Sequence, residues 1–158
     1  YVAWATDARR VYVQPADQKA VELPMPANTG GWWINSLSVH NGQAYISAFG
    51  SSGHIYRAPI DGSEEASAYY DVTGPRHIVV NSGGAYIAFG DTANGVDNGI
   101  GWNPIDPNAA GAADGKVLTA LDTAEVMRMQ VTDDAIYYAT YSSRSGGAAG
   151  IWKIAFDK

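Results

Sequence analysis

The sequence predicts an all-β protein made of repeated, four-stranded units. Apolar and aromatic residues alternate with a period of two along most of the 158 residues, and no stretch has helical periodicity. In addition, strand tyrosines recur along the chain with steps of 44, 41 and 51 residues, at Tyr1, Tyr45, Tyr86 and Tyr137. A period of roughly 40–45 residues with four strands per unit is typical of the blades of a β-propeller.

The clearest unit is the stretch AYISAFGSSGHIYRAPIDGS, residues 44–63. It alternates as two strands joined by a Gly/Ser turn at 50–53, because Gly tolerates positive φ and Ser bonds its own backbone. An Asp closes this corner and recurs in the other units as Asp17, Asp61, Asp106 and Asp157. A turn Asp accepts hydrogen bonds from nearby backbone N–H groups, so these four residues are predicted to be structural.

The remaining strands follow from short apolar runs that end in turn pairs such as Asn41-Gly42 and Gly83-Gly84. In chain order the expected strands are 1–7, 9–16, 19–25, 35–40, 43–49, 54–60, 65–72, 76–81, 85–90, 99–105, 116–122, 126–132, 135–141 and 150–156.

These strands make one partial propeller domain, 1–158, with blades at about 1–30, 31–73, 74–123 and 124–158. The first blade lacks its innermost strand and the last lacks its outermost, so about three and a half blades are expected. The open blade edges predict either a larger propeller or completion by further copies of the chain.

Composition excludes several classes of function. A net charge of −6 argues against nucleic acid, whose phosphates require a basic surface. No apolar run approaches the ~20 residues of a membrane span. Zero cysteines exclude disulfides and thiol catalysis. The low Lys content and many Tyr, Trp, Gly and Ser favour an extracellular or cell-surface location, with the periplasm as the alternative, and Tyr1 predicts a mature, cleaved or partial product.

The segment HIYRAPIDGS, residues 54–63, followed by GPRHIVV, residues 74–80, resembles the YWTD-type propeller repeat and its bacterial relatives. The second unit matches best, whereas the third has Asp-Pro-Asn at 106–108 and the nearest approach to Trp-Thr-Asp is WATD at 4–7. The resemblance implies a mostly non-enzymatic propeller that binds proteins or carbohydrates, or serves as a scaffold.

Aligning the units on Val39, Val80 and Val131 places several polar and aromatic residues at the starts of the innermost strands, where they would rim the central channel. This candidate ligand site consists of Trp32, Trp33, Asn35, Arg76, His77 and Arg128. Trp faces suit sugar rings and cations, and Arg suits carboxylates. The alternative is that the two Trp residues pack between blades as core.

Two further chemistries are weaker in the sequence. The turn at 90–99 carries oxygen-bearing side chains that suit Ca²⁺, and ordinary turn chemistry explains them as well: Asp91, Asn94, Asp97 and Asn98. His77, beside Arg76 and Arg128, is the one candidate general base, although a structural His is the simpler interpretation. None of the common hydrolase or nucleotide-binding motifs occurs.

We therefore expect a non-catalytic binding or assembly module, completed by a larger propeller or by self-association. One alternative is a carbohydrate-binding, lectin-like propeller. The other is a propeller lyase or hydrolase with its site at the mouth of the central channel. The expected partner is a protein or further copies of the chain at the open blade edges, with a glycan as the alternative and neither nucleic acid nor a membrane among them.

Overall fold

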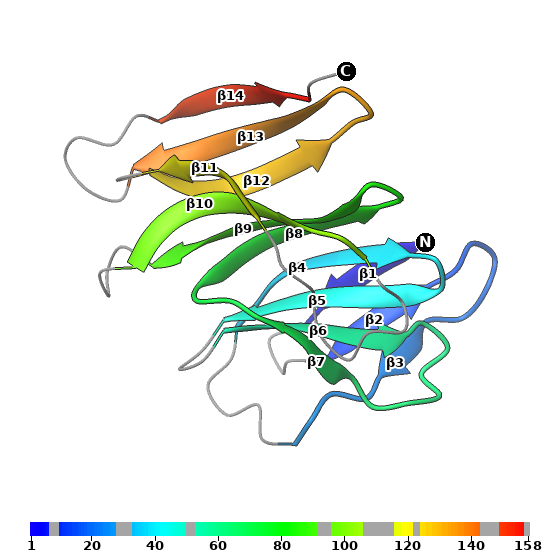
Figure 1. Ribbon diagram of the computed structural model, residues 1–158. Coiled ribbons are helices and arrows are strands. Elements are labelled where there is room, and N and C mark those ends of the chain that lie inside the picture. The colour runs from blue at the N-terminus through cyan, green and yellow to red at the C-terminus, as the bar shows by residue number, and fades with distance from the viewer. Residues whose placement is uncertain are drawn as a thin grey trace.

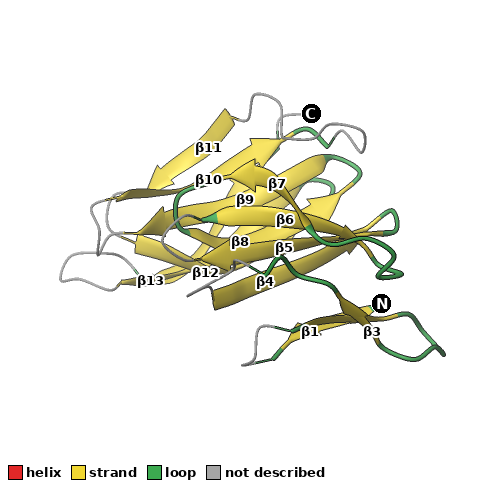
Figure 2. Ribbon diagram, turned by 90° about the horizontal axis from the view of Figure 1, so that it is seen from below, coloured by secondary structure: helices red, strands yellow, loops and turns green. Residues whose placement is uncertain are grey.

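The computed structural model describes residues 1–6, 10–27, 33–49, 53–91, 96–105, 116–121, 124–142 and 149–156. These residues form fourteen strands: β1 (Val2–Ala5), β2 (Val11–Gln14), β3 (Val21–Leu23), β4 (Trp33–His40), β5 (Gln43–Phe49), β6 (His54–Pro59), β7 (Ser67–Asp71), β8 (Pro75–Asn81), β9 (Gly84–Asp91), β10 (Val96–Asn103), β11 (Lys116–Leu121), β12 (Ala124–Val131), β13 (Ala135–Ser142) and β14 (Gly150–Ala155). Only strands and loops appear in this part of the chain (Figure 2).

The strands make four antiparallel sheets that follow one another along the chain (Figure 1). Sheet 1 is β1-β2-β3, sheet 2 is β4-β5-β6-β7, sheet 3 is β8-β9-β10-β11 and sheet 4 is β12-β13-β14. Each strand pairs with the next in sequence, so every sheet is a meander closed by short turns. The predicted all-β, propeller-type repeat of three and a half units is confirmed, although β10 starts three residues before the predicted strand, at Val96.

Three apolar layers hold the sheets together, one at each sheet–sheet interface. Period-two alternation explains them, because neighbouring residues of one strand face opposite sheets. In β5, Ile46 packs towards sheet 1 while Tyr45 packs towards sheet 3. Between sheets 3 and 4 the layer is built around Ile100 and Ile136, both fully buried.

The first strands of sheets 2 and 3 lie side by side and are joined by serine hydroxyls. Ser38 Oγ accepts a 2.9 Å hydrogen bond from the backbone N–H of Val80. Ser36 Oγ accepts one from the N–H of Ile78, at 3.2 Å. These bonds satisfy N–H groups on the edge of β8 that no strand covers, and they fix the register of β4 against β8.

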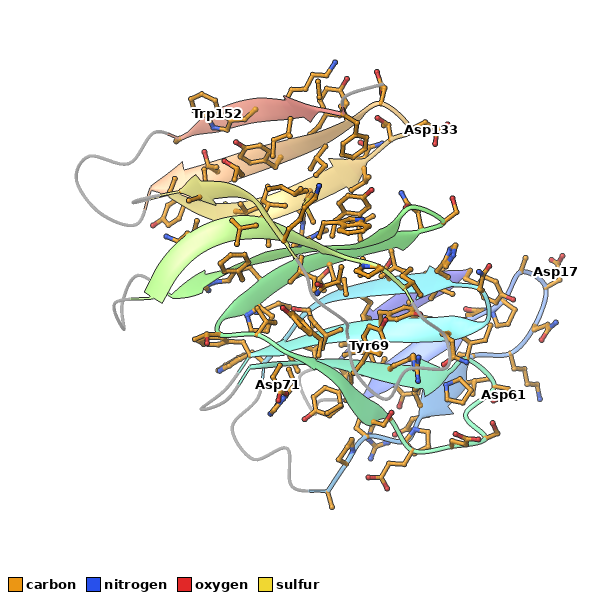
Figure 3. The ribbon with its side chains drawn as sticks, viewed as in Figure 1. Asp17, Asp61, Tyr69, Asp71, Asp133 and Trp152 are labelled. Atoms are coloured by element: carbon orange, nitrogen blue, oxygen red, sulfur yellow. The ribbon has the colours of Figure 1, made fainter. Side chains whose placement is uncertain are left out.

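The corner after β6 behaves as a structural joint, as predicted for Asp61. Its carboxylate accepts a 3.0 Å hydrogen bond from the backbone N–H of Ser63, and bonding to Ser63 lowers the pKa of Asp61. Gly62 follows with φ +69, and Asp17 at the equivalent corner has φ 60. Both corners lie on one side of the molecule, with Asp133 on the same side (Figure 3). Asp106 and Asp157 lie outside the described residues.

Candidate functional site

Three of the predicted site residues meet in one pocket on the side of the first strands. Asn35 comes from β4, His77 from β8 and Arg128 from β12, so these three residues come from three different sheets. The pocket has a volume of about 320 Å³, and Ala3, Ala5, Ile34, Ser36 and Leu37 complete its lining. We call it the inner-strand pocket.

The floor of this pocket is fixed by hydrogen bonds to backbone. Asn35 Nδ2 donates to the carbonyl oxygen of Pro75 at 2.8 Å, which ties β4 to the start of β8. Ser36, the next residue, bonds Ile78 as described above. The polar side chains are thus held by the same contacts that set the register of the two strands.

His77 and Arg128 give the pocket its electrostatic character. Burial, with a smaller contribution from the charge of Arg128, lowers the pKa of His77 from 6.5 to about 4. The imidazole is therefore neutral at pH 7. Its Nδ1 is buried and has no hydrogen-bond partner among the described residues. Arg128 is exposed, so a cation stands at the mouth of a pocket whose interior is uncharged.

Arg76, the fourth predicted residue, does not line the pocket but joins several elements. Its Nη2 lies 3.2 Å from Glu125 Oε2 on β12, and its Nε donates to the carbonyl oxygen of Gly90 at 3.1 Å. The guanidinium also stands over the ring of Phe49, 5.2 Å from its centroid. These contacts connect sheets 2, 3 and 4 through the guanidinium of Arg76. A structural role therefore accounts for an arginine at the start of β8, and no ligand is needed to explain it.

The predicted tryptophans are placed only in part. Trp33 opens β4 and its residue surface is 71% exposed, so it does not pack between sheets as core. Trp32 lies outside the described residues.

The predicted calcium turn is also described only in part. Asn94 lies outside the described residues, and so do the side chains of Asp91 and Asp97. Asn98 belongs to β10 and is buried against Gly90, where an added Cβ would clash with Asn98 Oδ1. Both its amide atoms lack partners within the described ranges, and those ranges hold no group of three acidic, His or Cys side chains suited to a metal.

For catalysis, His77 offers a neutral imidazole with a pKa of about 4. A base this weak is poorly matched to proton abstraction near pH 7, where the best catalytic pKa lies close to the working pH. The neighbouring charged group is the cation Arg128, which opposes protonation of the ring. The pocket is better suited to holding a ligand than to transferring a proton.

Sequence reasoning missed a second cavity, which lies between sheets 2 and 3 on the side of their later strands. Its volume is about 390 Å³. Its lining comes from the end of β7 and from β9, β10 and β11: Tyr70, Asp71, Val72, Thr73, Ile87, Phe89, Gly101, Trp102, Asn103, Lys116 and Val117. We call it the inter-sheet cavity. Gly101 is the sequence signal that could have revealed this cavity, because the equivalent strand positions of sheets 2 and 4 carry the aromatic residues Tyr56 and Trp152.

The outer face of sheet 4 exposes several large apolar and aromatic side chains. Ile151 is 83% exposed, and Tyr137 and Tyr141 on β13 are exposed beside it. Within the described residues β14 pairs only with β13, whereas the equivalent strands β6 and β10 are paired on both edges. Exposed apolar surface next to an open strand edge is the usual signature of a surface that binds other chains.

Comparison with known proteins gives a likeness at the level of structure. A solved structure described as YCF48 bound to D1 peptide is similar to this chain, with 12% sequence identity and a TM-score of 0.39. The superposition covers 87% of this chain and 56% of that one, so the chain spans little more than half of that protein's length. No family model and no curated protein matches the sequence. Within the described residues, no helix has the length and apolar character needed to cross a membrane.

Proposed function

We propose that the protein is a non-catalytic binding module whose inner-strand pocket takes an anionic group, such as a carboxylate of a partner. The observation that carries the proposal is the meeting of Asn35, His77 and Arg128, from three sheets, in one polar pocket. A guanidinium binds carboxylates strongly because its N–H groups match both oxygens.

The state of His77 supports an anion over a cation. Burial lowers the pKa of His77 most, and the charge of Arg128 lowers it further, so Arg128 places a positive potential at the ring. An anion bound between the two side chains would offset the contribution of Arg128 and raise the pKa of His77. Binding of an anion and protonation of His77 are therefore coupled, and each favours the other.

The coupling gives a direct experiment. The ring protons of His77 are followed by NMR from pH 3 to pH 8, without and with millimolar citrate or acetate as the probe anion. We expect the pKa of His77 to rise from about 4 when the carboxylate is present. The variant Arg128→Gln should lose the effect of citrate on the ring.

Arg10→Gln serves as the matched control, since Arg10 is an exposed arginine that pairs with Glu22 on sheet 1 and does not line the pocket. It should respond to citrate as the parent protein does. A titration of His77 that citrate leaves unchanged, or equal effects of the two arginine variants, would contradict the proposal.

Self-association is a second candidate, and the outer face of sheet 4 favours it. A copy of the chain that covered Ile151, Tyr137 and Tyr141 would remove apolar area from water, and strand addition at β14 would satisfy its free backbone groups. Light scattering should then give a molar mass that rises with concentration above the 16.7 kDa of one chain. Ile151→Lys should lower it. A mass of 16.7 kDa at every concentration would exclude this candidate.

We also propose that the repeat is related to the YWTD-type propeller repeat and that the protein is extracellular or at the cell surface. A glycan remains the alternative ligand, and the exposed Trp33 supports it, since an open indole face can stack on a sugar ring. A glycan array with the parent and Trp33→Ala would separate this alternative. Binding that Trp33→Ala does not change would exclude the Trp33 site.

A further inference from the structure

The three units with complete strand pairing around their tyrosines allow a position-by-position comparison. Tyr45, Tyr86 and Tyr137 pair with Arg57, Trp102 and Lys153 on the next strand of their sheets. The residue that precedes each of these partners in the sequence is on the face towards the preceding sheet. That residue is Tyr56 in sheet 2, Gly101 in sheet 3 and Trp152 in sheet 4. They pair with Ile46, Ile87 and Tyr138, respectively, on the neighbouring strand.

The two aromatic residues are held by different contacts. Tyr56 is only 5% exposed and belongs to the apolar layer between sheets 1 and 2. Trp152 has the corresponding position in sheet 4, where it is 44% exposed and its Nε1 donates to Thr140 Oγ1 at 2.9 Å, and Figure 3 shows it on β14. Each side chain is a planar ring that carries a hydrogen-bond donor.

Gly101 leaves this place empty between sheets 2 and 3. A Cβ at Gly101 would be 3.5 Å from the nearest atom, a ring carbon of Phe89, so the position has room for a side chain. Gly101 lines the inter-sheet cavity, whose volume of about 390 Å³ lies within the range of ligand pockets. The cavity is thus found where the repeat elsewhere has a ring.

A second departure from the repeat lies two residues further along β10. Asn103 occupies the position of Ala58 in sheet 2 and Ile154 in sheet 4, and it also lines the cavity. The residue is 3% exposed, and its Oδ1 finds no hydrogen-bond partner in the described part of the chain. A buried acceptor without a partner is costly, and a bound donor would remove that cost.

From these two departures we infer that the inter-sheet cavity binds a planar aromatic ring that carries an O–H or N–H donor. The donor bonds Asn103 Oδ1 after the side-chain amide turns towards the cavity, because this oxygen is covered in the structure. Ile87, Phe89 and Tyr70 form walls suited to the faces of the ring. Asp71 and Lys116 also line the cavity, and Asp71 is hydrogen-bonded to Nδ1 of His54 at 2.5 Å. Phenol and indole rings have the required chemistry.

The test uses three small probes that differ in the donor. Binding of p-cresol, 3-methylindole and toluene to the whole chain is measured by NMR, from shifts of the backbone amides of Gly101 and Asn103. The two rings with a donor should bind roughly five- to tenfold more tightly than toluene, because a net hydrogen bond is worth about 1 kcal/mol and 1.4 kcal/mol is tenfold. No binding of any ring at millimolar concentration, or equal binding of all three, would overturn the inference.

Two variants examine the site itself. Gly101→Val should reduce binding of all three rings, because it fills part of the cavity. Asn103→Ile, which installs the residue found at 154, should abolish the preference for donors while toluene still binds. Ala139→Val introduces the same valine side chain on β13, outside the cavity, and should bind the rings as the parent does. A donor preference that survives Asn103→Ile overturns the assignment, and far-ultraviolet circular dichroism confirms that each variant is folded.

A further arm of the experiment separates two sources of the ring. N-acetyl-tyrosine amide and a short peptide with a central Tyr are compared with p-cresol. Binding of the peptide at least as tightly as p-cresol identifies the ring as a side chain of a partner. Binding of p-cresol alone identifies it as a small molecule. Both results require the same cavity and the same donor, and failure of every probe leaves the inner-strand pocket untouched because the two sites share no residue.

Discussion

Two interfaces of this repeat protein use the same positions in different ways. Between sheets 1 and 2, Tyr56 and Ala58 fill the layer with apolar atoms. Between sheets 2 and 3 the equivalent residues are Gly101 and Asn103, and a cavity of about 390 Å³ occupies the space. The same repeat position therefore holds a buried ring in one unit and borders a cavity in the next.

The largest effect is expected from emptying the filled interface. Tyr56→Ala should lower the free energy of unfolding by about 3–5 kcal/mol, because it removes a buried ring and leaves a cavity. Urea unfolding followed by fluorescence measures the loss. Tyr141→Ala, at an exposed tyrosine, is the control. If Tyr56→Ala lowers the free energy of unfolding no more than Tyr141→Ala does, the ring of Tyr56 does not stabilise the interface.

A pair of glycines in β10 sharpens the comparison. Gly99→Ala should cost about 1–3 kcal/mol, because its Cβ would lie 2.8 Å from both a Phe89 ring carbon and the Thr119 carbonyl oxygen. Gly101→Ala should instead be neutral or stabilise by about 0.4–1 kcal/mol, since the new methyl has room. Equal losses for the two variants would mean that the cavity is closed in solution.

The serine bonds between β4 and β8 should contribute less. Ser38→Ala removes the 2.9 Å bond to the N–H of Val80 and should cost about 1 kcal/mol. Ser67→Ala, at an exposed position of β7, is the control and should be close to neutral. If the two variants unfold at the same urea concentration, the hydroxyl of Ser38 does not hold the strands together.

A separate effect is the dependence of stability on pH through His77. The pKa of His77 is 6.5 when unfolded and about 4 when folded, so the unfolded chain takes up the proton first as the pH falls. The stability from the neutral ring is complete above pH 6.5 and is lost between pH 6.5 and about pH 4. Between pH 6.5 and about pH 4, the urea concentration at half-unfolding should fall less in His77→Gln than in the parent protein. Parallel curves for parent and variant would refute this assignment.

The fold was predictable because alternation and turn residues are local signals. The tyrosine strands and the corner at Asp61 follow from residues next to each other in the chain. The start of β10 was missed, since Val96 and Asn98 are surrounded by Gly, Asn and Asp, which resemble a turn. A register shift between Val96 and Gly99 interrupts the alternation at the same place.

The part of the candidate site that depends only on equivalent positions in the repeat was predictable from the sequence. Aligning the units brought His77 and Arg128 to one level, and the structure places both in one pocket with Asn35. The alignment did not reveal the ion pair of Arg76 with Glu125, which depends on how two sheets pack. The inter-sheet cavity was missed because a missing side chain gives no pattern of its own, and only comparison with Tyr56 exposes Gly101.

The most direct test of the account is the variant Gly101→Tyr, which places in the third sheet the ring that the second sheet has at 56. If the cavity is the vacant place of a repeat ring, the variant should unfold at a higher urea concentration than the parent and should no longer bind p-cresol. A variant that is less stable than the parent, or that binds p-cresol as before, would contradict the account.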